Sequence, residues 1–181
     1  MNRYLRSIVP GLLFLAITNI AAARDAGPAK LQRAPDFTLP DYQGHEISLA
    51  DFRGRVVLLQ FMQTGCPVCQ RHAPILEELY RKYKDKGLVV IGVAHGASGP
   101  EEVKQFAQRF DLTYFLLPGD LEIAVRYLGI TPQASSFDVP RYFLISREGK
   151  IAKDLDPHVN ADFARDEKGA LEKAILEALG H

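Results

Sequence analysis

The chain has 181 residues, of which 47% are hydrophobic and 24% are charged, as expected for one globular domain that can bury a core. Lysine and arginine together number 22, as do aspartate and glutamate, so the formal net charge is zero. This balance gives no electrostatic reason to expect a nucleic-acid partner, and no run of like charges predicts a disordered tail.

The N-terminal residues have the three parts of a secretory signal peptide. Arg3 and Arg6 precede an apolar stretch over Ile8–Ile17, and the small residues Ala21–Ala23 follow it. A membrane anchor needs ~20 apolar residues, and Pro10 already interrupts this shorter run. We therefore expect a cleaved signal peptide, with a retained anchor as the alternative, and an extracytoplasmic location such as the periplasm. The expected divisions are a signal peptide over residues 1–23, a flexible segment over 24–33 and a folded domain over 34–181.

The first part of the expected domain reads as a hairpin, a strand and a helix. Alternating apolar and polar residues over Pro35–Pro40 and His45–Leu49 predict a small N-terminal hairpin. The continuous apolar run Val56–Phe61 predicts a strand buried on both faces. A helix should follow over Pro67–Lys84. Its charged pairs, four residues apart, are expected on the solvent side: Glu77–Arg81 and Glu78–Lys82.

The second part alternates strands and helices and then ends in a hairpin and a helix. Ser98 to Glu101 reads as a capping box that opens a helix, and Asp120 is expected to cap another. Strands are expected at 88–93, 114–117, 142–146 and 151–155, and the last helix carries an apolar face from Leu171 to Leu179. This order predicts an α/β fold whose mixed central sheet is covered by helices on both faces, with the hairpin as an N-terminal extension.

The only two cysteines, Cys66 and Cys69, are separated by Pro67 and Val68. A disulfide closing so short a loop would stabilise the fold by roughly 2 kcal/mol, against ~4.7 kcal/mol for a 100-residue loop, so a structural role is a poor use of both thiols. Cys66 stands where a helix should begin, and the helix dipole and free N–H groups there favour a thiolate. Pro67 suits the first helical position. We therefore predict that Cys66 attacks disulfides and that Cys69, one turn further in, resolves the mixed disulfide.

His72 follows Cys69 by three residues, so the two side chains should share one face of the helix. An imidazole titrates near pH 6.5 and suits proton transfer beside the cysteines. The alternative is a solvated helix histidine with no part in the chemistry, and the sequence leaves both interpretations open.

Three motifs in the chain resemble one family in the right order. Ala34–Leu39 and Leu49–Leu58 resemble the N-terminal part of redoxins, a group that includes the TlpA/ResA-like thiol–disulfide oxidoreductases and the peroxiredoxins. The two cysteines followed by Pro74 resemble the active-site helix of thioredoxin, and Val139–Pro140 resembles the cis-proline loop that faces the cysteines.

The resemblance implies a thioredoxin-like fold and a thiol–disulfide oxidoreductase that acts on disulfides of protein substrates, most naturally as a reductase. It places Pro140, in a cis peptide bond, beside Cys66. It also implies a membrane-bound thiol donor that keeps the protein reduced, and it calls for no cofactor and no metal. We expect the protein to be a monomer.

The chain departs from the family pattern at four places. Gly65 replaces the usual tryptophan before the first cysteine, and Gln60 replaces the buried aspartate of thioredoxin. His72 stands where TlpA/ResA-like proteins often have a glutamate. Thr131–Asp138 looks like an insertion, either an exposed flap that selects clients or an inert extension.

Two other functions compete with thiol–disulfide exchange. A peroxiredoxin needs a threonine three residues and a proline seven residues before its reactive cysteine, and Cys66 is preceded there by Gln63 and Leu59. The arginine expected of a peroxidase is out of register at Arg141, which we expect to be an exposed charge instead.

A copper-binding chaperone of thioredoxin fold is the second competitor. Two thiolates and an imidazole, from Cys66, Cys69 and His72, suit a soft ion such as Cu(I). His95 or His158 would supply a fourth ligand; otherwise these two histidines are expected to be polar loop residues.

Overall fold

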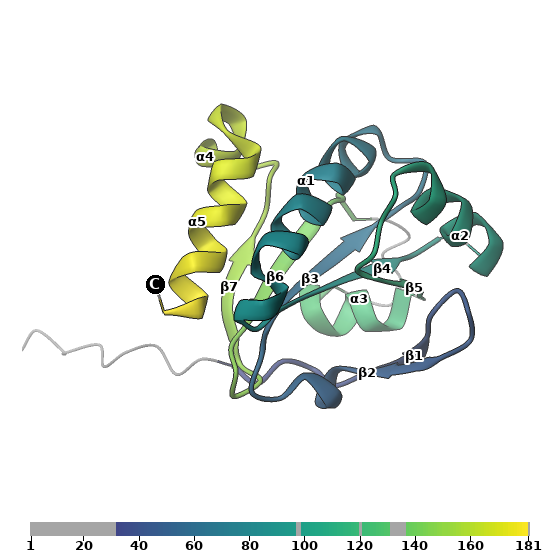
Figure 1. Cartoon of the computed structure of the whole chain (residues 1–181), viewed down its shortest axis with the longest axis horizontal. Helices are drawn as coiled ribbons and strands as arrows, with labels where there is room; N and C mark the ends of the chain where they lie inside the picture. The colour runs from purple at the N-terminus through teal and green to yellow at the C-terminus, as the bar shows by residue number, and fades with distance from the viewer. Residues whose placement is uncertain (1–31, 97–98, 120, 131–136, 181) are drawn as a thin grey trace, which may run out of the picture. The chain divides into compact units, whose positions relative to one another are not determined.

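The computed structural model describes residues 32–96, 99–119, 121–130 and 137–180 (Figure 1). The expected signal peptide and nearly all of the expected flexible segment lie outside these residues. Arg33, at the end of that segment, forms an isolated β-bridge with Lys150. None of the helices in the described ranges combines the length and the apolar character that a membrane span requires.

A five-stranded mixed sheet with the strand order β5-β4-β3-β6-β7 forms the centre of the domain. Neighbouring strands are parallel from β5 to β3, whereas β6 runs antiparallel to β3 and β7 antiparallel to β6. A separate antiparallel hairpin is formed by β1 and β2. The strand bounds are Thr38–Pro40 (β1), Glu46–Ser48 (β2), Val56–Met62 (β3), Leu88–Ala94 (β4), Phe115–Pro118 (β5), Arg141–Ile145 (β6) and Ile151–Leu155 (β7).

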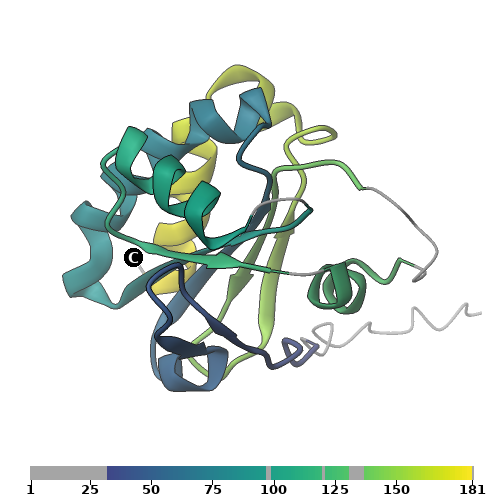
Figure 2. The ribbon, with the colours of Figure 1, turned by 90° about the vertical axis from the view of Figure 1, so that its right-hand side faces the viewer.

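Helices cover both faces of this sheet, with α1, α2 and α5 on one side and α3 on the other (Figure 2). Alternate residues of the strands point to opposite faces, so Leu58 packs beneath α1 while Leu59 packs in the core beneath α3. The helix bounds are Pro67–Tyr83 (α1), Pro100–Arg109 (α2), Leu121–Leu128 (α3), Ala161–Arg165 (α4) and Glu167–Leu179 (α5), with short 3-10 turns at Leu49–Phe52 and Lys84–Lys86. The predicted α/β fold with its N-terminal hairpin is confirmed.

The start of α2 differs from the prediction. The expected capping box is wrong because the helix begins one residue later, with Gly99 at the N-cap and Pro100 at the first helical position, where its missing N–H is no loss. Ser98 and Asp120 lie outside the described residues. The short helix α4 was not predicted; Asn160 begins it by accepting a hydrogen bond from the N–H of Asp162.

The charged side chains of α1 also differ from the prediction. Glu77 lies in the core at 6% exposure, where it binds Thr113 as well as Arg81. Glu78 does lie on the surface, but it pairs with Lys168 rather than with Lys82. Helical spacing thus predicted the Glu77–Arg81 pair correctly, whereas Thr113 and Lys168 come from a loop and a helix that pack against α1.

Candidate active site

Cys66 occupies the N-cap of α1, directly after the turn that follows β3. Its Sγ accepts a hydrogen bond from the backbone N–H of Cys69 at 3.3 Å, and Pro67 takes the first helical position. The Cys66 side chain is half-buried and both cysteines are free thiols. The predicted start of the helix at the first cysteine is therefore confirmed.

Cys69 differs sharply from Cys66 in its surroundings. It is 1% exposed, and burial raises the pKa of the Cys69 thiol, with a further rise from its hydrogen bond to Cys66. A thiol in this position cannot ionise in contact with bulk water. The pair thus consists of one accessible sulfur and one enclosed sulfur.

The loop before β6 brings a proline next to Cys66. The Val139–Pro140 peptide bond is cis, as the resemblance implied. The carbonyl oxygen of Val139 accepts a hydrogen bond from the Cys66 thiol at 3.5 Å, and Nε2 of His158 lies 3.2 Å from the same oxygen. His158, expected to be a polar loop residue or a fourth copper ligand beside the cysteines, therefore lies at the carbonyl that Cys66 contacts.

His72 is 0% exposed, so the interpretation of a solvated helix histidine is wrong. Its Nδ1 lies 2.6 Å from the hydroxyl oxygen of Tyr142, and its Nε2 lies 3.1 Å from Oε2 of Glu167. The second contact is at ion-pair distance without the alignment of a good hydrogen bond. Phe163 stacks against the rings of both His72 and Tyr142.

The Tyr142 hydroxyl has a second partner in Gln60. The two residues are paired across β3 and β6, so their side chains share the face beneath α1. Nε2 of Gln60 donates to the Tyr142 hydroxyl at 3.1 Å. Gln60 thus links to His72 through Tyr142 at the position where thioredoxin has an aspartate.

Charge around His72 is set mainly by Glu167, at the start of α5. Arg71 binds Glu167 with both Nε and Nη2, and this ion pair is the main reason why the pKa of the Glu167 carboxyl lies below its ordinary value. Burial lowers the pKa of His72, and Glu167 only partly opposes that effect. His72 is therefore a neutral imidazole beside a carboxylate at pH 7.

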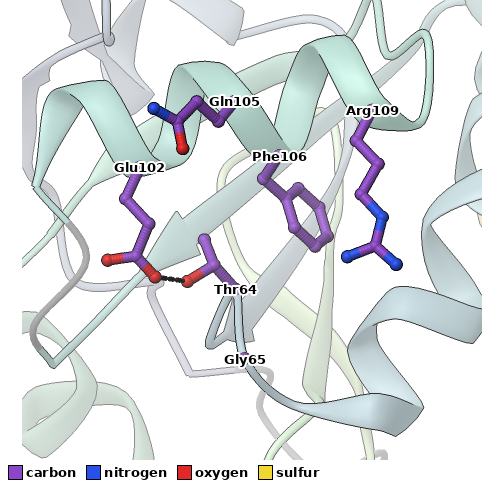
Figure 3. Close-up of a pocket in the computed structure, with 6 residues that line it drawn as sticks. All are labelled: Thr64, Gly65, Glu102, Gln105, Phe106 and Arg109. Atoms are coloured by element: carbon purple, nitrogen blue, oxygen red, sulfur yellow. Dashed lines mark hydrogen bonds between the residues drawn. The ribbon is translucent and has the colours of Figure 1, made fainter.

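A hollow of about 240 Å³ opens beside the turn that carries Cys66 (Figure 3). It is lined by Thr64, Gly65, Glu102, Gln105, Phe106 and Arg109. The Thr64 hydroxyl donates to the Glu102 carboxylate across it. A Cβ atom at Gly65 would meet nothing within 4 Å, so this residue leaves open the space next to Cys66.

The remaining sequence candidates lie elsewhere. His95 lies in the loop directly after β4, as expected, but it is buried at 5% exposure, and its ring stacks on Phe137 with centroids 4.3 Å apart. Arg141, expected to be an exposed charge, is half-buried and pairs with both Asp154 and Asp156. Of the expected insertion, residues 131–136 lie outside the described part.

The ligand set suggested for copper is not assembled in the described part of the chain. No group of three or more His, Cys, Asp or Glu side chains there is close enough to hold one ion. Both nitrogens of His72 face Tyr142 and Glu167, not a shared site with the two thiols.

Comparison with known proteins supports the chemistry of the cysteine pair. The model of the AhpC/TSA family matches residues 31–154. The thiol-disulfide oxidoreductase ResA of Geobacillus thermodenitrificans is 36% identical over 121 residues, which cover 66% of this chain and 65% of that protein. ResA of Bacillus thuringiensis is 32% identical over 124 residues, 68% of each chain.

A solved structure agrees with these relatives. The solution structure of a thiol:disulfide interchange protein from Bacteroides superimposes with a TM-score of 0.62 at 28% identity, covering 81% of this chain and 90% of that one. The predicted similarity to TlpA/ResA-like redoxins of thioredoxin fold is therefore confirmed. The relatives support thiol–disulfide exchange as the class of activity.

Proposed function

The chain belongs to the AhpC/TSA family, and from this premise we propose that it is an extracytoplasmic thiol–disulfide oxidoreductase that reduces disulfides of protein substrates. The observation that carries the proposal is the unequal pair of thiols, with Cys66 accessible at a helix N-cap beside Pro140 and Cys69 enclosed one turn later. The extracytoplasmic location rests on the signal peptide expected over residues 1–23.

The reaction proceeds in two exchanges. The Cys66 thiolate attacks one sulfur of a client disulfide, which forms a mixed disulfide and releases the other client sulfur as a thiolate. Cys69 then loses its proton and attacks Cys66, so that the client leaves fully reduced and the Cys66–Cys69 disulfide remains. A membrane-bound thiol donor returns the pair to its reduced form, and the protein acts as a monomer.

The loop and the hollow beside Cys66 provide the surface for the client. Pro140 has no N–H of its own, so it presents no donor to the client, and the Val139 carbonyl beside it becomes available to an extended client segment once the Cys66 thiol has reacted. A client joined to Cys66 also passes Gly65, where the hollow is open to its side chains. His72 is the proposed group for proton handling next to Cys69.

Capture of mixed disulfides tests the proposal. A Cys69→Ser variant should retain disulfide-linked client proteins, because the attack of Cys66 proceeds and resolution does not. The matched Cys66→Ser variant should retain none and should reduce no protein disulfide. Equal capture by the two variants, or consumption of hydrogen peroxide by the wild type at the rate of its disulfide exchange, would refute the assignment.

A further inference from the structure

The resolving step requires a proton acceptor inside the protein. Cys69 is 1% exposed, so its proton cannot pass directly to bulk water. Among the described residues, the polar groups near Cys69 include the Cys66 sulfur, which accepts a hydrogen bond from the Cys69 backbone N–H, and His72, one helical turn away on the same face. The hydroxyls of Tyr142 and Tyr114 belong to the same buried cluster as Cys69.

The hydrogen bonds of Tyr142 fix the positions of the protons. Its oxygen accepts from Nε2 of Gln60, so its own O–H is free to donate, and the available acceptor is Nδ1 of His72 at 2.6 Å. His72 therefore carries its proton on Nε2, which lies 3.1 Å from Glu167. If Nδ1 takes up a second proton, the imidazole becomes positively charged, and the Glu167 carboxylate lies beside its Nε2–H.

The charges around this chain of groups make it able to accept one proton. Burial, with smaller contributions from Arg71 and His158, disfavours a second proton on His72, and Glu167 favours it, so the imidazole is neutral before the reaction. Burial raises the pKa of the Tyr142 hydroxyl and the Cys69 thiolate raises it further. The hydroxyl consequently passes a proton on and does not itself stay ionised.

We propose that Tyr142 and His72 together take the proton of Cys69 in the resolving step, and that Glu167 is a positioning residue whose negative charge beside Nε2 favours the protonated imidazole. The inference rests on the proposed function and deepens it.

The Tyr142–His72 pair takes up the Cys69 proton, which ends on Nδ1 of His72 and leaves the imidazole positively charged. The Cys69 sulfur attacks Cys66, the bond between Cys66 and the client sulfur breaks, and that sulfur leaves with the electron pair. The protein pair is oxidised and the client is reduced.

Stopped-flow reaction with the chromogenic aromatic disulfide dithiobis-nitrobenzoate separates the two steps, because the first aromatic thiol is released by Cys66 and the second by Cys69. Tyr142→Phe should slow the second release roughly 10- to 100-fold at pH 7, as expected for the loss of a general base, and shift its pH dependence upward. The first release should keep the wild-type rate. Glu167→Gln, at a half-buried surface position, should also slow only the second release and change its pH profile.

Tyr114→Phe is the matched control. Tyr114 is buried in the same cluster, but its hydroxyl has no hydrogen-bond partner among the described residues, so both releases should keep their wild-type rates. The inference fails if Tyr142→Phe and Glu167→Gln both leave the second release unchanged between pH 6 and 9, or if Tyr114→Phe slows it equally. Absence of the first release from the wild-type protein would instead refute the proposed function.

Discussion

Only two residues separate Cys66 from Cys69 in the sequence, yet the fold exposes the first thiol to solvent and buries the second. Cys66 caps α1 at the surface, and Cys69 is enclosed beneath the helix. Because alkylation requires an accessible thiolate, iodoacetamide at pH 7 should modify Cys66 at least about tenfold faster than Cys69. Mass spectrometry of Cys69→Ser and Cys66→Ser, each with one thiol, measures the two rates separately. Faster labelling of Cys69 would reverse the assigned roles.

Sequence reasoning reached the cysteines, Pro140 and His72 because local motifs carry them. It missed Tyr142 and Glu167, which contact His72 from 70 and 95 residues away. The first of these contacts depends on the register that pairs β3 with β6, and the second on where α5 begins. Gln60, a polar residue within an apolar run, was the available signal that a buried hydrogen-bonded group lies beneath the helix.

Glu77 links helix α1 to the loop before β5 through hydrogen bonds. The Glu77 carboxylate accepts the backbone N–H of Thr113 at 2.7 Å and the Thr113 hydroxyl at 2.6 Å. Glu77→Ala should lower the free energy of unfolding by about 1–3 kcal/mol, because it removes two hydrogen bonds to a charged carboxylate. Urea denaturation followed by circular dichroism measures the change.

The adjacent Glu78 is the control for this substitution. Its pair with Lys168 is exposed, so Glu78→Ala should change the stability by less than about 0.5 kcal/mol. Equal losses from the two substitutions would show that the link to Thr113 contributes nothing beyond helix propensity.

The strands and the longer helices follow from hydrophobic periodicity, and for that reason their order was predictable. The continuous apolar run predicts that β3 is buried on both faces, and the apolar stripe predicts that one face of α5 is buried. Helix ends are set by single backbone groups, so the start of α2 shifted by one residue. Helix α4 has only five residues, too few for a periodic pattern.

At the scale of the whole molecule, two buried histidines should make stability depend on pH. Burial lowers the pKa of both His72 and His95 in the folded protein, whereas in the unfolded chain both titrate near pH 6.5. Below that pH the unfolded chain binds protons that the folded protein does not, so the free energy of unfolding falls as the pH falls. For each histidine that stays neutral, the loss between pH 7.5 and 5.5 is up to about 1.4 kcal/mol.

A substitution at His95 separates its contribution to the pH dependence of stability from that of His72. His95→Phe keeps a ring against Phe137 and removes a nitrogen that lacks a partner among the described residues. Urea denaturation of the reduced protein at pH 7.5, 6.5 and 5.5 should therefore show a shallower loss of stability for the variant than for the wild type. The difference at pH 5.5, relative to pH 7.5, should approach the share of one histidine, about 1 kcal/mol. Parallel pH profiles for the two proteins would mean that His95 takes up its proton in the folded state as readily as in the unfolded chain.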